Sequence, residues 1–216
     1  MKRKKTFIIV ILVLIMLTIP VLAIYLPTDD ILQRIPLIRD FYSNTSLIVT
    51  SVNSQSEIKI NGKDYGKTNQ TISNLPEGSY SVELERVAQE PNFYKAHTFN
   101  IDVTKNTESI LSIEIGPNSI IGGYMLYYTE NPSRNRSGTL SVSTDNVDAD
   151  VYIDNKFQGK TPFSTRDISS TNHSLRVSAT GYESQNIPII VRDGYNLNVN
   201  IYLMPVPITF QTETNE

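Results

Sequence analysis

The chain contains the same pattern twice. When the sequence is shifted by 93 residues, about forty positions from 47 onward match without a gap. Matched pairs include Leu47 with Leu140, Ile58 with Val151, Ile60 with Ile153, Val82 with Leu175, and Gly66-Lys67-Thr68 with Gly159-Lys160-Thr161. Beyond an insertion of five residues in the first copy, around 91–94, the offset is 88. Because the matched residues are of buried or turn type, the repeat preserves an architecture and no active site.

Both copies show the period-two alternation of strands with one buried face. We expect strands around 47–49 and 58–60 and at 79–87, 97–103 and 108–115 in the first copy, and at 139–144, 150–154, 174–179, 186–191 and 197–203 in the second. Asn61-Gly62 and Asp154-Asn155 are typical of tight hairpin turns, which need positive φ. Gly66 and Gly159 suggest turns that leave the second strand of each copy.

The segment between the copies, 118–137, is expected to be a linker. Its second half, 131–138, is rich in Asn, Pro, Ser and Gly and is typical of an exposed connection. Its first half carries Gly122-Gly123 and tyrosines at 124, 127 and 128, which is too apolar for such a connection. We expect this half to pack on a module or to add an edge strand.

The first 26 residues point to a membrane. Four basic residues, Lys2 to Lys5, precede an apolar run at 7–26 that is long enough to cross a bilayer as one helix. Basic flanks stay on the cytoplasmic side, which predicts a cytoplasmic tail at 1–6, a stalk at 27–45 and an exported remainder. A cleaved signal peptide ending near Ala23 is the alternative, and it exports the same residues.

Charge narrows the choice of partners. The formal net charge is −3, and with the four basic residues of the tail set aside the rest of the chain carries −7. Binding to nucleic acid depends on lysine and arginine, so no nucleic-acid partner is expected. The chain has no cysteine, so no disulfide supports the exported modules.

The residues offer no visible catalytic or metal chemistry. The two histidines, His97 and His173, are not at equivalent positions of the repeat, and neither has zinc-ligand spacing. Aspartates at 145, 148, 150 and 154 match no calcium loop and are typical of a solvated rim. The Gly-Lys-Thr runs lack the upstream glycine and the following helix of a phosphate-binding loop. We expect no enzyme activity, no cofactor and no metal.

Aromatic residues in the insertion are the candidate ligand contacts. Asn92, Phe93 and Tyr94 occur only in the first copy, and exposed rings on a rigid scaffold often bind sugars or proteins. The alternative is that these rings cover the end of a small core.

The second copy reads Val-Tyr-Ile-Asp154-Asn155-Lys156, Gly159-Lys160-Thr161-Pro162 and then Gly181-Tyr182, and the first reads Leu75-Pro76-Glu77-Gly78-Ser79-Tyr80. These runs resemble the PEGA domain, over about 46–117 and 138–206. The resemblance implies two small β-sandwiches of the kind found in prokaryotic surface-layer and envelope proteins, which act as non-catalytic interaction modules. The second copy departs from it at 169–173, where Ser-Ser-Thr-Asn-His replaces the namesake loop.

The sequence therefore predicts an all-β protein with two tandem β-sandwich domains behind one N-terminal transmembrane helix and a flexible tail at 207–216. We expect it to be a non-enzymatic binding or structural protein of the cell envelope, anchored in the membrane and exposed outside it. Two alternatives remain open: a carbohydrate-binding module that holds the membrane to cell-wall or surface-layer polysaccharide, and an accessory subunit of a membrane complex. The expected partner is an envelope protein or polysaccharide.

Overall fold

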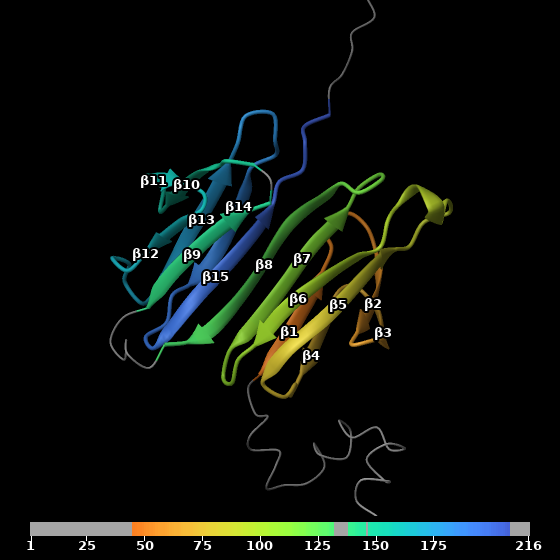
Figure 1. Ribbon diagram of the computed structural model, residues 1–216, viewed down its shortest axis with the longest axis horizontal. Coiled ribbons are helices and arrows are strands. Elements are labelled where there is room, and N and C mark those ends of the chain that lie inside the picture. The colour runs from red at the N-terminus through yellow and green to blue at the C-terminus, as the bar shows by residue number, and fades with distance from the viewer. Residues whose placement is uncertain (1–44, 132–137, 146, 208–216) are drawn as a thin grey trace, which may run out of the picture. The chain divides into compact units, whose positions relative to one another are not determined.

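A computed structural model describes residues 45–131, 138–145 and 147–207 (Figure 1). These residues form fifteen strands and one short 3-10 helix, which confirms the all-β prediction for them. The predicted tail at 1–6, the membrane span at 7–26, nearly all of the stalk and the tail beyond 207 lie outside the described residues. Within the described ranges, no helix is long and apolar enough to cross a bilayer.

Each repeat contributes strands to two sheets. The first repeat contains β1 (Ser46–Thr50), β2 (Ser56–Ile60), β3 (Lys63–Lys67), β4 (Gln70–Ser73), β5 (Gly78–Arg86), the 3-10 helix η1 (Pro91–Phe93), β6 (His97–Val103) and β7 (Glu108–Ile115). The second contains β9 (Thr139–Thr144), β10 (Asp150–Ile153), β11 (Lys156–Lys160), β12 (Phe163–Thr165), β13 (Asn172–Ser178), β14 (Gln185–Ile190) and β15 (Tyr195–Tyr202). The strand β8 (Ile121–Glu130) lies between them in sequence.

The predicted hairpins are confirmed. Asn61 and Gly62 both have positive φ, 50° and 79°, and they join β2 to β3. Asp154 and Asn155, at 50° and 63°, join β10 to β11. Positive φ at both central residues gives a turn whose twist matches that of the strands, so this chemistry fixes the register of both hairpins.

The expected turns at Gly66 and Gly159 are not there. Gly66 lies inside β3 and Gly159 inside β11, and each faces a register shift in the partner strand, β2 or β10. Both glycines have positive φ, 84° and 150°. Each register shift marks a β-bulge: Tyr65 and Gly66 lie opposite Ile58, and Gln158 is the extra residue beside Gly159, which pairs with Val151. Glycine adopts the positive φ at these positions without a steric cost.

One sheet runs through both repeats. Its seven strands follow the order β12-β9-β15-β8-β7-β1-β4, and each repeat adds a separate four-stranded sheet, β3-β2-β5-β6 or β11-β10-β13-β14. β8 pairs antiparallel with β7 on one side and with β15 on the other. The two sandwiches therefore share their large sheet, and β8 is a central strand where the sequence suggested an edge strand or simple packing.

Successive residues of β8 belong to different cores. Met125 lies opposite Leu111 of β7 and belongs to the core of the first repeat. Leu126 lies opposite Val199 of β15 and belongs to the core of the second. Because neighbouring side chains on a strand point to opposite faces, the two four-stranded sheets cover opposite faces of the shared sheet. In Figure 1, β5 and β6 lie in front of that sheet, and β13 and β14 lie behind it.

The glycines before this apolar run allow β8 to approach β7. Gly123 has a φ of 123°, and a Cβ atom there would collide with the main-chain carbonyl oxygen of Ser112. Only glycine meets both conditions, so Gly123 is required where the two repeats join.

Candidate binding cleft between the repeats

The predicted contact loop, Asn92 to Tyr94, has one strongly exposed ring. Asn92 is exposed at the surface. The ring of Phe93 is 49% exposed and meets the ring of Tyr94 edge to face, with 5.3 Å between the ring centroids. Phe93 is therefore available to a partner from this loop.

Tyr94 is held by the protein itself. It is partly buried against the first core, and the guanidinium group of Arg86 lies 4.4 Å from the centroid of its ring. On either side of it, the amide of Asn118 donates to the carbonyl of Phe93 at 2.8 Å, and the amide of Lys95 donates to the carbonyl of Asn118 at 3.0 Å. Tyr94 thus covers the core, as the alternative interpretation of the loop expects. A ligand role for the loop stays a prediction.

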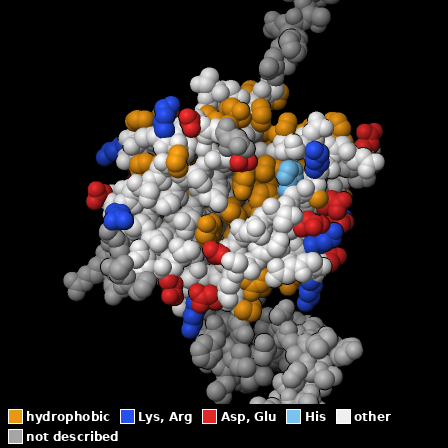
Figure 2. Space-filling model, viewed as in Figure 1, with side chains coloured by type: hydrophobic (Ala, Val, Ile, Leu, Met, Phe, Trp, Pro, Cys, Tyr) orange, Lys and Arg blue, Asp and Glu red, His pale blue; other side chains and the backbone are white. Residues whose placement is uncertain are grey.

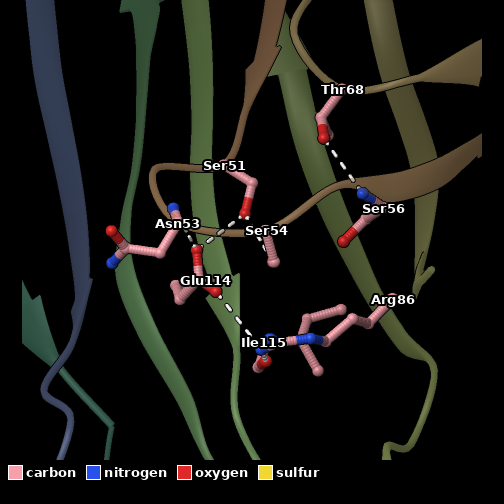
Figure 3. A network of polar contacts seen from close by, with 8 residues as sticks. All are labelled: Ser51, Asn53, Ser54, Ser56, Thr68, Arg86, Glu114 and Ile115. Carbon is pink, nitrogen blue, oxygen red and sulfur yellow. Dashed lines mark hydrogen bonds and ion pairs between the residues drawn. The ribbon is translucent and has the colours of Figure 1, made fainter. Parts of the chain in front are cut away.

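Arg86 connects this loop to a polar network (Figure 3). Its Nη1 atom lies 3.3 Å from Oε1 of Glu114 and also donates to the carbonyl of Ile115. The side chain of Glu114 is only 14% exposed, so this ion pair is largely shielded from water.

Glu114 also accepts hydrogen bonds from the loop after β1. The Ser51 hydroxyl and the Asn53 amide each donate to its Oε2 atom at 2.9 Å. Partial burial acts to raise the pKa of Glu114, but hydrogen bonds from Asn53, Ser54 and Ser51, together with the charge of Arg86, outweigh it. The pKa of this carboxyl group is therefore held below its ordinary value, and the group is an anion that fixes the 51–54 loop.

A second set of contacts holds the start of that loop, and part of it recurs in both repeats. The amide of Ser51 donates to Oδ1 of Asn69 at 2.9 Å. The buried Thr68 hydroxyl accepts from the amide of Ser56 at 3.0 Å, and Thr161 accepts from the amide of Ala149 in the same way at 3.1 Å. The threonine contact therefore belongs to the fold.

The Glu114 network belongs to the first repeat alone. The offsets of 93 and 88 place Ala179 where Arg86 stands and Tyr202 where Glu114 stands. The second repeat therefore folds without this network. In the sequence, the difference between the two copies at positions 86 and 114 is the feature that distinguishes it. Ser51, Asn53 and Glu114 were not among the predicted site residues, because polar residues in a loop or alternating along a strand such as β7 resemble an ordinary solvent-facing surface.

Glu114 forms one wall of a cleft of about 360 Å³ between the repeats. The first repeat contributes Val52, Asn53, Ser112 and Glu114, β8 contributes Gly122, Gly123 and Tyr124, and the second repeat contributes Glu183, Gln185, Asn186 and Met204. Val52 is 80% exposed. Because both repeats and β8 contribute lining residues, a single repeat would lack part of the wall of this cleft.

The cleft is lined mainly by polar groups. The one deeply placed carboxylate, Glu114, is already engaged by Arg86 and the 51–54 loop. The remaining polar groups are hydroxyls, amides and the exposed carboxylate of Glu183. Such groups orient a bound molecule through hydrogen bonds.

The residues considered for metal binding do not assemble. Nδ1 of His173 lies 2.7 Å from Asp154, and Asp150 pairs with Lys160 at 3.4 Å. His97 stacks on Phe99 with 6.4 Å between ring centroids. No group of three or more histidine or acidic side chains with ligand geometry occurs in the part of the chain that the structure describes.

Comparison with known proteins agrees with the duplicated architecture. The model of the PEGA domain matches the chain twice, at residues 44–118 and 137–207. These bounds leave out β8, the strand that joins the repeats. No curated protein matches the chain, and no solved structure does either. The chain is a member of the PEGA domain family with two copies of that domain.

Proposed function

We propose that this protein is a non-enzymatic binding protein of the cell envelope. In this proposal, residues 7–26 attach it to the membrane and the two repeats lie outside. Membership of the PEGA family supports a surface-binding module. A basic tail ahead of a long apolar run supports the anchor and its orientation.

The observation that carries the proposal is the cleft between the repeats. Residues from both repeats and from β8 line it. Its floor includes β7 and β8 of the shared sheet, and Gln185 and Asn186 come from β14 of the second repeat's separate sheet. Its loop at 51–54 is locked by Glu114, which gives the ligand a preformed surface. Preorganised polar groups bind without a large cost in ordering. Both histidines lie outside the cleft, which supports binding over acid–base chemistry.

Crosslinking in intact cells tests this proposal. A photoreactive residue replaces Val52 at the cleft in the full-length chain, and the same residue replaces Phe157, which is 57% exposed on the β10–β11 hairpin, as the control. We expect a discrete adduct from position 52 that position 157 does not give. Substituting Gln185 and Asn186 by alanine should weaken the adduct. Equal labelling from 52 and 157, or none from 52, would contradict binding at the cleft.

Protease treatment tests the location separately. Protease added outside whole spheroplasts should digest the two repeats and leave the amino-terminal tail protected. Repeats that stay protected while the membrane is intact would contradict the proposed orientation. Digestion of the adduct from position 52 with proteases or with glycosidases then distinguishes a protein partner from a polysaccharide.

A further inference from the structure

An uncharged polar surface lies on the second repeat's half of the shared sheet, on the side away from β13 and β14. We call it the amide–hydroxyl face. It consists of Asn196, Asn198 and Asn200 on β15 and Thr139, Ser141 and Ser143 on β9, and all are partly exposed except Thr139, which is buried at the edge of the face. These residues alternate with core residues, so all six point to the side opposite the second core. None of them carries a charge.

The six side chains form a regular ladder. The parallel register places Asn196 beside Thr139, Asn198 beside Ser141 and Asn200 beside Ser143. Thr139 donates to Oδ1 of Asn196, and Ser143 donates to Oδ1 of Asn200 at 2.8 Å. Each asparagine is thus held in one orientation by its neighbour on β9 or β8.

These contacts leave hydrogen-bonding capacity along β15. The Nδ2 groups of Asn196 and Asn200 have no partner among the described residues. Asn198 is oriented the other way, because its Nδ2 donates to Thr129 at 3.3 Å and its Oδ1 has no described partner. The strand therefore presents donor, acceptor and donor groups in turn, about 7 Å apart.

The fold does not require these asparagines. The offset of 88 places Glu108, Ile110 and Ser112 of β7 at the positions of Asn196, Asn198 and Asn200. The first repeat forms the same parallel ladder with those residues. Asparagine is disfavoured in strands, so three of them at alternate positions indicate a role beyond the fold.

Two tyrosines border the ladder. Tyr127 of β8 lies directly opposite Asn198, and Tyr202 follows Asn200 on the same face of β15. The ring of Tyr202 meets Phe99 edge to face at 5.5 Å, which fixes its orientation. Figure 2 shows the uncharged polar surface over β9 and β15 and, beside it, a hydrophobic band in a hollow towards β6.

We propose that the amide–hydroxyl face binds an extended, uncharged polysaccharide chain. Sugar hydroxyls both donate and accept, as the ladder does, and tyrosine rings pack on the apolar faces of sugars. A polyanion would need lysine or arginine, which the face lacks. A protein partner would need apolar or arginine anchors at the centre, where this face has serine and asparagine. From Asn196 to Tyr202 the face is about 20 Å long, which suits an oligomer better than a single sugar.

The test uses the full-length chain purified in detergent micelles. Co-sedimentation with insoluble cellulose and with chitin, and titration with the soluble hexamers of both polymers, measure binding. Heparin–agarose serves as the polyanion. The test variants carry the first repeat's residues, Asn196→Glu alone and Asn196→Glu/Asn198→Ile/Asn200→Ser. Asn100→Glu, at an exposed position of β6, adds the same charge outside the face.

We expect retention on at least one neutral polymer, a Kd at least tenfold weaker in both test variants, and no change with Asn100→Glu. Unchanged thermal unfolding would show that the test variants keep the fold. The inference is overturned if neither neutral polymer is bound, if heparin is preferred, or if Asn196→Glu binds as the wild type does. It is also overturned if the face instead joins two copies in a dimer that Asn196→Glu dissociates.

This inference rests on the proposed function only for the location of the protein. If the adduct from position 52 is absent but the polymer is still bound, binding at the cleft is contradicted and binding at the amide–hydroxyl face still holds. If the adduct forms but no polymer is bound, binding at the amide–hydroxyl face is contradicted and binding at the cleft still holds. The two outcomes are independent because the two surfaces lie on opposite sides of the shared sheet.

Discussion

Met125 and Leu126 are neighbours on β8, yet their side chains lie in different hydrophobic cores. Met125 is 5% exposed and Leu126 is 3% exposed, so the strand is buried on both faces. A strand covered on both faces has a continuous apolar run in place of alternation. The repeats are therefore two halves of one body, and β8 belongs to both.

Gly123→Ala should strongly destabilise the protein. The added methyl group would collide with the Ser112 carbonyl at a φ of 123°, so we expect the free energy of unfolding to fall by at least about 3 kcal/mol. Gly181→Ala is the matched control, because Gly181 also has positive φ, 82°, but has open space around it. Its cost should be about 1 kcal/mol. Chemical denaturation measures both, and equal costs would contradict the close approach of β7 and β8.

Tyr94→Ala and Phe93→Ala should differ although the residues are adjacent. Tyr94 packs on the core beneath Arg86, so its removal should cost about 2 kcal/mol of unfolding free energy. Phe93 is half exposed and contributes one edge-to-face contact, so its removal should cost less than about 1 kcal/mol. Thermal unfolding of the two variants measures the difference. A larger cost for Phe93→Ala would mean that the loop packs the other way round.

The Glu114 network should make stability depend on acid. The pKa of Glu114 is lowered in the folded state, so its contribution is present above the ordinary glutamate pKa. That contribution is lost as the pH falls through the lower pKa of the folded protein. Glu114→Gln should lower the free energy of unfolding by about 2 kcal/mol at neutral pH. It should also make the free energy of unfolding depend less on pH in acid.

Glu183→Gln is the control for that experiment, since Glu183 lies on the same cleft but is exposed. Chemical denaturation between pH 3 and pH 7 measures the free energy of unfolding. As the pH falls, this free energy should decline more steeply for the wild type and for Glu183→Gln than for Glu114→Gln. Equal slopes in all three proteins would contradict a stabilising role for the Glu114 carboxylate.

The repeat and its hairpins were predictable because their signals are local. Asn61-Gly62 carries the positive φ values of its turn in its own residue types, and strands such as β6 and β7 alternate clearly. The short strands β3, β4, β11 and β12 were missed because their residues are mostly exposed and follow no alternation.

The role of β8 and of the asparagines could not be derived from one strand at a time. The apolar run at 124–128 fits an edge strand, a packed segment or a central strand equally well, and only pairing with both β7 and β15 decides. Asn196, Asn198 and Asn200 show the period of an ordinary solvent face. Their ladder appears only when β9 is placed beside β15.

The most direct test of the shared sheet is the unfolding of variants with one damaged core. Leu84 and Leu175 are fully buried in the first and second cores, and Leu→Ala at either site should cost about 3 kcal/mol. Hydrogen exchange of β5 and β13 in the full-length chain measures both halves at once. If the two repeats share one sheet, either variant should lower the protection of both strands in one cooperative transition. Two transitions, with only the damaged repeat affected, would contradict it.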